Sequence, residues 1–263
     1  MNFGISNGVN YIRQTSNGMK IIIKNNYDEL SKEAANIIKE EIQKKPNLVL
    51  GLATGSTPIG CYKELIRMHK EERLDFSQVT TFNLDEYIGL PANHPQSYNF
   101  FMYENFFNSI NVSSNNIYIP DGMAENVEEF SKEYEKKIKE AGGIDLQLLG
   151  IGSDGHIGFN EPGTPLDSRT HLVNLAVSTI KDNSRFFEKE EDVPRSAITM
   201  GIQTIFEAKK ILLLASGENK AEAVAKFIEG PITPQITASV LQKHLDTIVI
   251  LDKAAASKLK GKY

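Results

Sequence analysis

Short apolar runs alternate with amphipathic segments along the chain, and this alternation constrains the fold more than any other feature. The apolar runs predict strands at 20–24, 48–53, 79–83, 144–151, 196–200, 210–215 and 247–251, with 172–177 as a further candidate. Apolar residues at the helical period predict helices at 28–45, 58–70, 97–107, 124–141 and 221–229. The alternation predicts an α/β fold: one domain with a doubly wound, largely parallel, Rossmann-like sheet and helices on both faces.

The segment 1–18 does not follow this pattern. It is polar and lacks the apolar stretch of a signal peptide. We interpret it as a disordered N-terminal extension or a remnant of expression, and we predict that 19–263 forms the single domain.

Composition excludes several classes of partner. The 263 residues carry a formal net charge of −5, which argues against a nucleic-acid partner. No apolar run approaches the roughly 20 residues of a membrane-spanning helix, so no membrane partner is expected. The chain has one cysteine, Cys61, and therefore no internal disulfide, which fits the reducing cytoplasm.

The densest group of candidate functional residues lies in the glycine-rich run Leu149–Pro162, directly after a predicted strand. This run places Asp154, His156 and Glu161 within eight residues, among four glycines. Two acids and a histidine at the carboxyl end of a strand favour an acid–base site.

Three other interpretations of this run are open. Gly150–Gly155 matches the dinucleotide-binding pattern G-x-G-x-x-G, but the glycines and prolines that follow predict no helix, which that pattern requires. The three polar side chains could bind zinc or iron, although no second histidine or cysteine nearby completes a usual ligand set, so no metal is expected. The run could also be a purely structural loop.

A second candidate site follows the strand at 48–53. Thr54, Gly55, Ser56 and Thr57 lead into Pro58, and we expect Thr57 to cap a helix whose first residue is Pro58. A glycine turn before a helix N-terminus suits a phosphate group. No Walker A lysine follows, which favours a monophosphate over a nucleoside triphosphate. A plain strand–helix turn is the alternative.

Three more side chains are candidates for the same edge of the sheet. Asp85 follows the strand at 79–83, where open α/β sheets bind ligands, although it could simply cap a turn or helix. Arg185, on a predicted helix between apolar rings, and Lys220, one turn after a strand, could each reach an anion. The segment 97–107 is interpreted as core rather than as a ligand-stacking site, on the helical spacing of Phe100, Phe101, Met102, Phe106 and Phe107.

These motifs together resemble those of the glucosamine-6-phosphate deaminase family. The similarity runs from Met19 to Asp252, in order and at family spacing. Its most specific part is Asp-Gly-His-Ile-x-Phe-Asn-Glu-Pro, and the matching segments are 52–58, 83–87, 97–98, 152–162, 168–170 and 183–187. The wider superfamily also contains 6-phosphogluconolactonases and sugar-phosphate-sensing repressor domains, so the fold alone does not decide the function.

The resemblance implies an enzyme of amino-sugar catabolism that hydrolyses a C–N bond. The family converts glucosamine 6-phosphate and water to fructose 6-phosphate and ammonia, without an organic cofactor. Asp85 matches the base that moves a proton between C2 and C1, and it is expected to be ionised near neutral pH. His156 matches the group that opens the sugar ring, and Asp154 and Glu161 match its carboxylate partners.

The resemblance also implies that the phosphate group binds to Thr54–Thr57, Arg185 and Lys220. One departure concerns regulation. Some members are hexamers activated by N-acetylglucosamine 6-phosphate through an arginine and a lysine after Ser-Arg-Thr, where this chain has His171-Leu172-Val173. The chain also lacks the longer C-terminal tail of those members. We therefore expect the shorter, non-allosteric type, as a monomer or small homo-oligomer.

Two alternative functions belong to different classes. A lactonase of the same superfamily would need a histidine base but no enolising carboxylate at Asp85. A sugar-phosphate-binding regulatory domain would carry a DNA-binding helix-turn-helix, for which the residues before Met19 are too few, and a basic face, which the net charge opposes.

Overall fold

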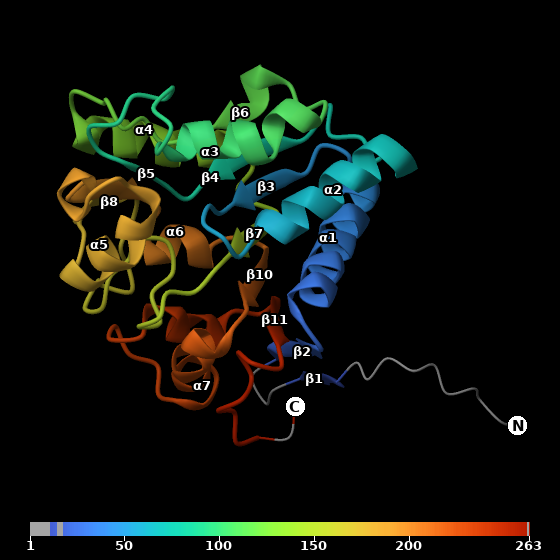
Figure 1. Cartoon of the computed structure of the whole chain (residues 1–263). Helices are drawn as coiled ribbons and strands as arrows, with labels where there is room; N and C mark the ends of the chain where they lie inside the picture. Colours follow the sequence, from blue (N-terminus) through green and yellow to red (C-terminus); the bar gives the residue numbers. More distant parts are fainter. Residues whose placement is uncertain (1–10, 15–17, 262) are drawn as a thin grey trace, which may run out of the picture.

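The computed structural model describes residues 11–14, 18–261 and 263, and its centre is a mostly parallel sheet (Figure 1). Its strand order is β1-β2-β11-β10-β7-β3-β4-β6, where β1 pairs antiparallel with β2 and the other neighbours are parallel. The strands are β1 (Tyr11–Gln14), β2 (Lys20–Lys24), β3 (Val49–Leu52), β4 (Thr80–Asn83), β6 (Ile117–Tyr118), β7 (Leu146–Leu149), β10 (Lys210–Ala215) and β11 (Thr247–Asp252).

Helices cover both faces of this sheet, as the alternation predicts. Successive side chains of a strand point to opposite faces, so Ile211 and Leu213 of β10 enter one core and Leu212 and Leu214 enter the other. The first core lies under α4 (Val127–Glu140), α6 (Ile202–Phe206) and α7 (Ala221–Glu229). The second lies under α1 (Tyr27–Lys44), α2 (Ile59–Glu72) and α3 (Tyr98–Asn105). The doubly wound α/β fold is confirmed.

A second, three-stranded antiparallel sheet lies beside the main one, and the sequence does not predict it. Its order is β5 (Asp85–Tyr87), β9 (Ser196–Thr199), β8 (His171–Asn174). The run at 196–200 was expected in the parallel sheet. The candidate strand at 172–177 is wrong at its end, because β8 stops at Asn174 and α5 (Val177–Asn183) begins at Val177.

The remaining elements are short. A 3₁₀ turn, η3 (Ser184–Phe186), follows α5 and carries Arg185, which was expected on a helix. The other 3₁₀ turns are η1 (Phe107–Ser109), η2 (Ser114–Asn116), η4 (Glu190–Asp192), η5 (Glu218–Lys220) and η6 (Thr237–Lys243). Within the described part of the chain, no helix combines the length and apolarity needed to cross a membrane.

Strand β1 falls inside the segment 1–18 that the sequence places outside the fold. Its four residues pair with β2 from Tyr11↔Ile23 to Gln14↔Lys20. The prediction of a disordered extension is therefore wrong for residues 11–14. Residues 1–10 and 15–17 lie outside the described part of the chain.

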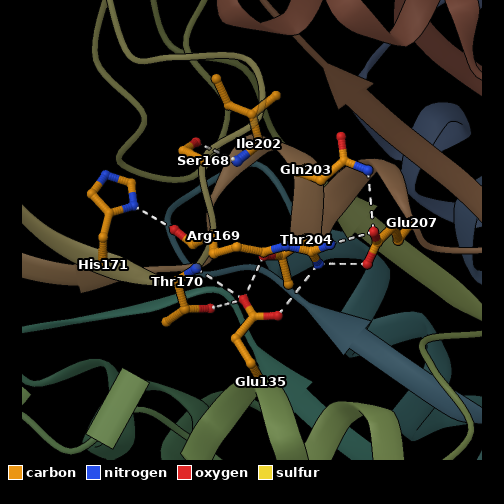
Figure 2. A network of polar contacts seen from close by, with 9 residues as sticks. All are labelled: Glu135, Ser168, Arg169, Thr170, His171, Ile202, Gln203, Thr204 and Glu207. Carbon is orange, nitrogen blue, oxygen red and sulfur yellow. Dashed lines mark hydrogen bonds and ion pairs between the residues drawn. The ribbon is translucent and has the colours of Figure 1, made fainter. Parts of the chain in front are cut away.

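Glu135 of α4 joins three elements in one polar network (Figure 2). One carboxylate oxygen accepts hydrogen bonds from the Thr170 amide at 2.9 Å, the Thr170 hydroxyl at 2.6 Å and the Thr204 hydroxyl at 2.5 Å. Arg169 lies 3.6 Å from the other oxygen and makes two 2.6 Å hydrogen bonds to Glu207. The network therefore fixes β8, and through it the second sheet, to α4 and α6.

We expect Glu135→Gln to destabilise the protein by about 1–3 kcal/mol, because the three hydrogen bonds weaken when their acceptor becomes neutral and the NH₂ group that replaces the other oxygen meets the guanidinium of Arg169. Urea unfolding followed by circular dichroism measures this. The matched control is Glu133→Gln in the same helix, where the side chain is exposed and a change within about 0.5 kcal/mol is expected. Equal midpoints for the two variants would contradict the structural role of the network.

Candidate active site

A cavity of about 710 Å³ opens at the carboxyl ends of the parallel strands. The loops that follow β3, β4, β7 and β10 all contribute to its wall, as expected for an open α/β sheet. Eight of the ten residues predicted from the sequence line it: Thr54, Gly55, Ser56, Thr57, Asp85, His156, Arg185 and Lys220. The other two, Asp154 and Glu161, lie against His156.

The loop 54–57 is held by two tyrosine hydroxyls that the sequence did not single out. The Tyr27 hydroxyl donates to the Ser56 and Thr57 carbonyls at 3.0 and 2.9 Å and accepts from the Gly60 amide at 2.8 Å. The Tyr62 hydroxyl donates to the Ala53 carbonyl at 2.5 Å. These contacts fix the loop before any ligand binds.

The helix start differs by one residue from the prediction. Helix α2 begins at Ile59, and Pro58 occupies the cap position with φ −79° and ψ −8° and no side-chain cap hydrogen bond. The expected cap by Thr57 is therefore wrong. Pro58 already has helical angles and its carbonyl accepts the first helical hydrogen bond, from the Tyr62 amide, so no side-chain cap is needed to start the helix.

On the opposite wall, the loop after β7 places an imidazole between two carboxylates. Nδ1 of His156 lies 2.7 Å from Oδ1 of Asp154 and 3.8 Å from Oε2 of Glu161. Burial acts to raise the pKa of Asp154, but the contact with His156 outweighs it and lowers that pKa below its usual value. The arrangement can orient the imidazole through Nδ1 while the ring faces the cavity.

The loop 152–162 contains no helix, which removes the dinucleotide interpretation. Gly152 is required because a Cβ there would lie 2.4 Å from the ring of His156. Asn160, which the sequence analysis left without a role, donates to the carbonyls of Ile157 and Met200 at 2.9 and 2.8 Å. The backbone carbonyl of Asn160 accepts a hydrogen bond from the Thr237 hydroxyl at 3.0 Å. The loop is therefore a rigid part of the fold.

The ligand atoms of Asp154, His156 and Glu161 lie within 4.8 Å of one another, so a metal site has to be considered. Two ligands at about 2.1 Å from a tetrahedral zinc ion lie about 3.4 Å apart. Nδ1 and Oδ1 are closer than that, at 2.7 Å. The spacing suits a direct imidazole–carboxylate contact better than a shared metal.

Asp85 lies on β5, where it pairs with Thr199, and it is only 6% exposed. It does not cap a helix, so that alternative is wrong for Asp85. Burial, and next the charge of Glu86, raise the pKa of Asp85 to about 8. Without a ligand the carboxyl group is therefore mostly protonated at neutral pH, contrary to the expectation of an ionised base.

Tyr98 and Asn183 also line the cavity, and both contact the buried Tyr87. Tyr98, at the start of the segment 97–107 interpreted as core, lines the cavity and stacks on Phe159 with ring centroids 5.9 Å apart. Its hydroxyl donates to that of Tyr87 at 3.3 Å, and Asn183 donates to the same Tyr87 oxygen at 2.8 Å. The Ser97-Tyr98 pair of the family motif was the sequence signal for this position.

Comparison with known proteins identifies the family. Residues 24–249 match the family model described as glucosamine-6-phosphate isomerases/6-phosphogluconolactonase. The chain belongs to this family. It is 58% identical over 239 residues to a glucosamine-6-phosphate deaminase from Thermoanaerobacter sp. (strain X514), covering 91% of this chain and 94% of that protein. A glucosamine-6-phosphate deaminase from Clostridium botulinum (strain Langeland) is 58% identical over 244 residues, covering 93% and 100%.

Solved structures of proteins with two different activities superpose on this chain. A monomeric glucosamine-6-phosphate deaminase superposes with a TM-score of 0.89 at 49% identity, covering 90% of this chain and 99% of that one. A 6-phosphogluconolactonase from Trypanosoma brucei superposes with a TM-score of 0.74 at 21% identity, covering 95% and 100%. The second likeness shows the shared fold alone.

We expect Asp85→Asn to stabilise the folded protein. The unfolded carboxyl loses its proton near pH 3.8, whereas the folded one keeps it up to about pH 8. Because the folded state binds more protons in between, the stability of the parent falls as the pH rises through this window. Asparagine has no titrating proton and therefore removes this pH-dependent loss of stability. The melting temperature of Asp85→Asn should therefore exceed that of the parent by a margin that grows from about pH 4 to pH 8.

The matched control is Asp167→Asn, which replaces an exposed aspartate and should leave the difference near zero at every pH. A pH-independent difference for Asp85→Asn would contradict a raised pKa at this position.

Proposed function

We propose that this chain is a glucosamine-6-phosphate deaminase of amino-sugar catabolism, which converts D-glucosamine 6-phosphate and water to D-fructose 6-phosphate and ammonia. The observation that carries the proposal is the pairing of two separate proton-transfer groups, Asp85 and His156, on one cavity. The identity of 58% to relatives with this name supports the same reaction.

The phosphate group would bind where the loop 54–57, Arg185 and Lys220 meet the cavity. Backbone amides of a turn before a helix, together with two cationic side chains, can bind a phosphate dianion. These local groups are needed because the chain as a whole carries a formal net charge of −5. This binding places the sugar between the two walls. The reacting carbons then lie between Asp85 and His156.

Ring opening is the first step we assign. His156 takes the proton of the C1 hydroxyl and delivers one to the ring oxygen, so that the C1–O5 bond breaks and the aldehyde forms. Asp154 and Glu161 stabilise the imidazolium that exists between the two transfers. The net proton count on the enzyme is unchanged at the end of this step.

Asp85 then acts as the enolising base. It removes the proton from C2: the C2–H electron pair forms the C1–C2 double bond, the π pair of the C1=O bond moves to O1, and O1 takes up the proton that the ammonium group on C2 releases. Return of the proton from Asp85 to C1 then leaves a protonated imine at C2 and restores the carboxylate. Water adds to C2 and ammonia departs, which gives the ketose. Although the unliganded Asp85 has a pKa of about 8, the substrate ammonium group on C2 would lie beside it and favour the carboxylate.

The partners follow from the same reasoning. We infer a small-molecule substrate, no organic cofactor or metal, no nucleic acid and no membrane, and a monomer acting in the cytoplasm. The similarity to a monomeric deaminase at 49% identity supports the oligomeric state. The single cysteine, Cys61, is buried, which suits a reducing compartment. The domain 19–263 would carry the whole site.

The purified protein should release ammonia and fructose 6-phosphate in equal amounts from glucosamine 6-phosphate. Asp85→Asn should lower kcat by about 10³-fold or more, because the enolising base is lost. A coupled assay for fructose 6-phosphate together with an ammonia assay measures both products. Hydrolysis of 6-phosphogluconolactone that survives Asp85→Asn, without ammonia release from the amino sugar, would favour the lactonase alternative.

The rate should depend hyperbolically on substrate concentration, and N-acetylglucosamine 6-phosphate should not activate the enzyme. The reason is that His171, Leu172 and Val173 stand where regulated members carry cations, and the neighbouring Arg169 is bonded to Glu207. Initial rates with and without the acetylated sugar phosphate test this. A sigmoidal curve that the effector makes hyperbolic would refute the non-allosteric assignment.

A further inference from the structure

Glu86, the neighbour of Asp85 on β5, is buried at 1% exposure and does not line the cavity. Successive residues of a strand point to opposite sides, so Asp85 faces the cavity and Glu86 faces α3. A buried carboxylate this close to a catalytic group requires a structural explanation.

The Glu86 carboxylate is satisfied by three backbone amides. Oε1 accepts from the amides of Tyr87 at 2.9 Å and Tyr98 at 2.8 Å, and Oε2 accepts from the amide of Asn99 at 2.8 Å. The Ser97 hydroxyl accepts a hydrogen bond from the next amide, that of Phe100, at 3.0 Å. The first three amides of α3, which no helical carbonyl can satisfy, are thus all bonded, two of them by a charged group from another element.

Through this contact Glu86 fixes Tyr98, the first residue of α3, against the strand that carries Asp85. Tyr98 in turn contacts β5 and two of the loops that form the site. Its ring stacks on Phe159 of the loop after β7, its hydroxyl contacts that of Tyr87, and it shares a hydrogen bond with the Thr54 side chain of the loop after β3.

We propose that Glu86 is a positioning residue for the reaction: it holds Asp85 and the Tyr98 ring at a fixed separation, so that the enolising base, the ring-opening loop and the phosphate-binding loop stay in register. This inference rests on the proposed function. Glu86 itself does not touch the substrate.

The charge of Glu86 adds a second effect on the same base. The groups that interact with it electrostatically are Asp85 and Tyr87 on β5, and Asp121 in the loop after β6. Burial raises the pKa of Glu86 to about 7, against the three amide hydrogen bonds. When ionised, it raises the pKa of its neighbour Asp85.

Two substitutions separate the position from the charge. Glu86→Gln removes the charge and weakens the amide contacts, and Glu86→Asp keeps the charge but shortens the side chain by one methylene.

Both variants should lower kcat/KM by about 10- to 100-fold, because small displacements of reacting groups have effects of this size. The acidic limb of the kcat/KM profile should move to lower pH in Glu86→Gln and stay in place in Glu86→Asp. The control, Glu104→Gln at an exposed position of α3, should match the parent in both kcat/KM and pH profile.

A double-mutant cycle with Tyr98→Phe and Glu86→Asp tests the route of the effect. If Glu86 acts through Tyr98, the combined loss in kcat/KM will be smaller than the product of the single losses. Amide hydrogen exchange at 97–102 should be faster in both Glu86 variants than in Glu104→Gln. A combined loss equal to the product of the losses in Glu86→Asp and Tyr98→Phe would show that the proposal is wrong.

A parental rate and pH profile in Glu86→Gln would overturn the proposal. If Glu86→Gln does not fold, Glu86→Asp carries the test alone, and a parental kcat/KM in that variant overturns it equally. If the parent itself releases no ammonia, the proposed function fails, whereas the exchange rates at 97–102 still decide whether Glu86 fixes the first turn of α3.

Discussion

Leu84 is the point at which the chain passes from one sheet to the other, and the site depends on this passage. Its amide donates to the Leu52 carbonyl of the parallel sheet at 3.1 Å, and its carbonyl accepts from the Met200 amide beside the second sheet at 2.7 Å. One buried residue therefore belongs to both hydrogen-bond systems. Asp85 follows directly, so its position relative to the loops after β3 and β7 is set by backbone pairing rather than by flexible side chains.

The sequence predicts the parallel sheet well because its strands are continuous apolar runs buried on both faces, as in 210–215. It does not predict the second sheet. Strand β5 has three residues, two of them acidic, and β8 alternates between half-buried and exposed side chains. Strand β5 is defined by a partner more than a hundred residues away, Thr199 for Asp85, and no local pattern encodes that pairing.

The candidate residues show the same division. Asp85, His156 and the loop 54–57 were found because they follow apolar strands, whose carboxyl ends meet at one edge. Tyr27, Tyr62 and Asn160 were not assigned roles, because their hydrogen bonds go to backbone atoms and leave no trace in the pattern of residue types. The raised pKa of Asp85 was missed for a related reason, since burial on a short strand cannot be read from the residues beside it.

The adjacent carboxyl groups of Asp85 and Glu86 explain why this region is built so rigidly. Burial raises the pKa of both, to about 8 and about 7, so the folded state retains protons that the unfolded chain would release. This retention of protons opposes folding at neutral pH. The strand pairing of Asp85 and the three amide hydrogen bonds of Glu86 hold both carboxyl groups in place despite this cost. A cationic substrate group next to Asp85 would relieve that opposition, so part of the intrinsic binding energy would ionise the base. The same burial that weakens the empty fold thus favours an amino sugar over a neutral one.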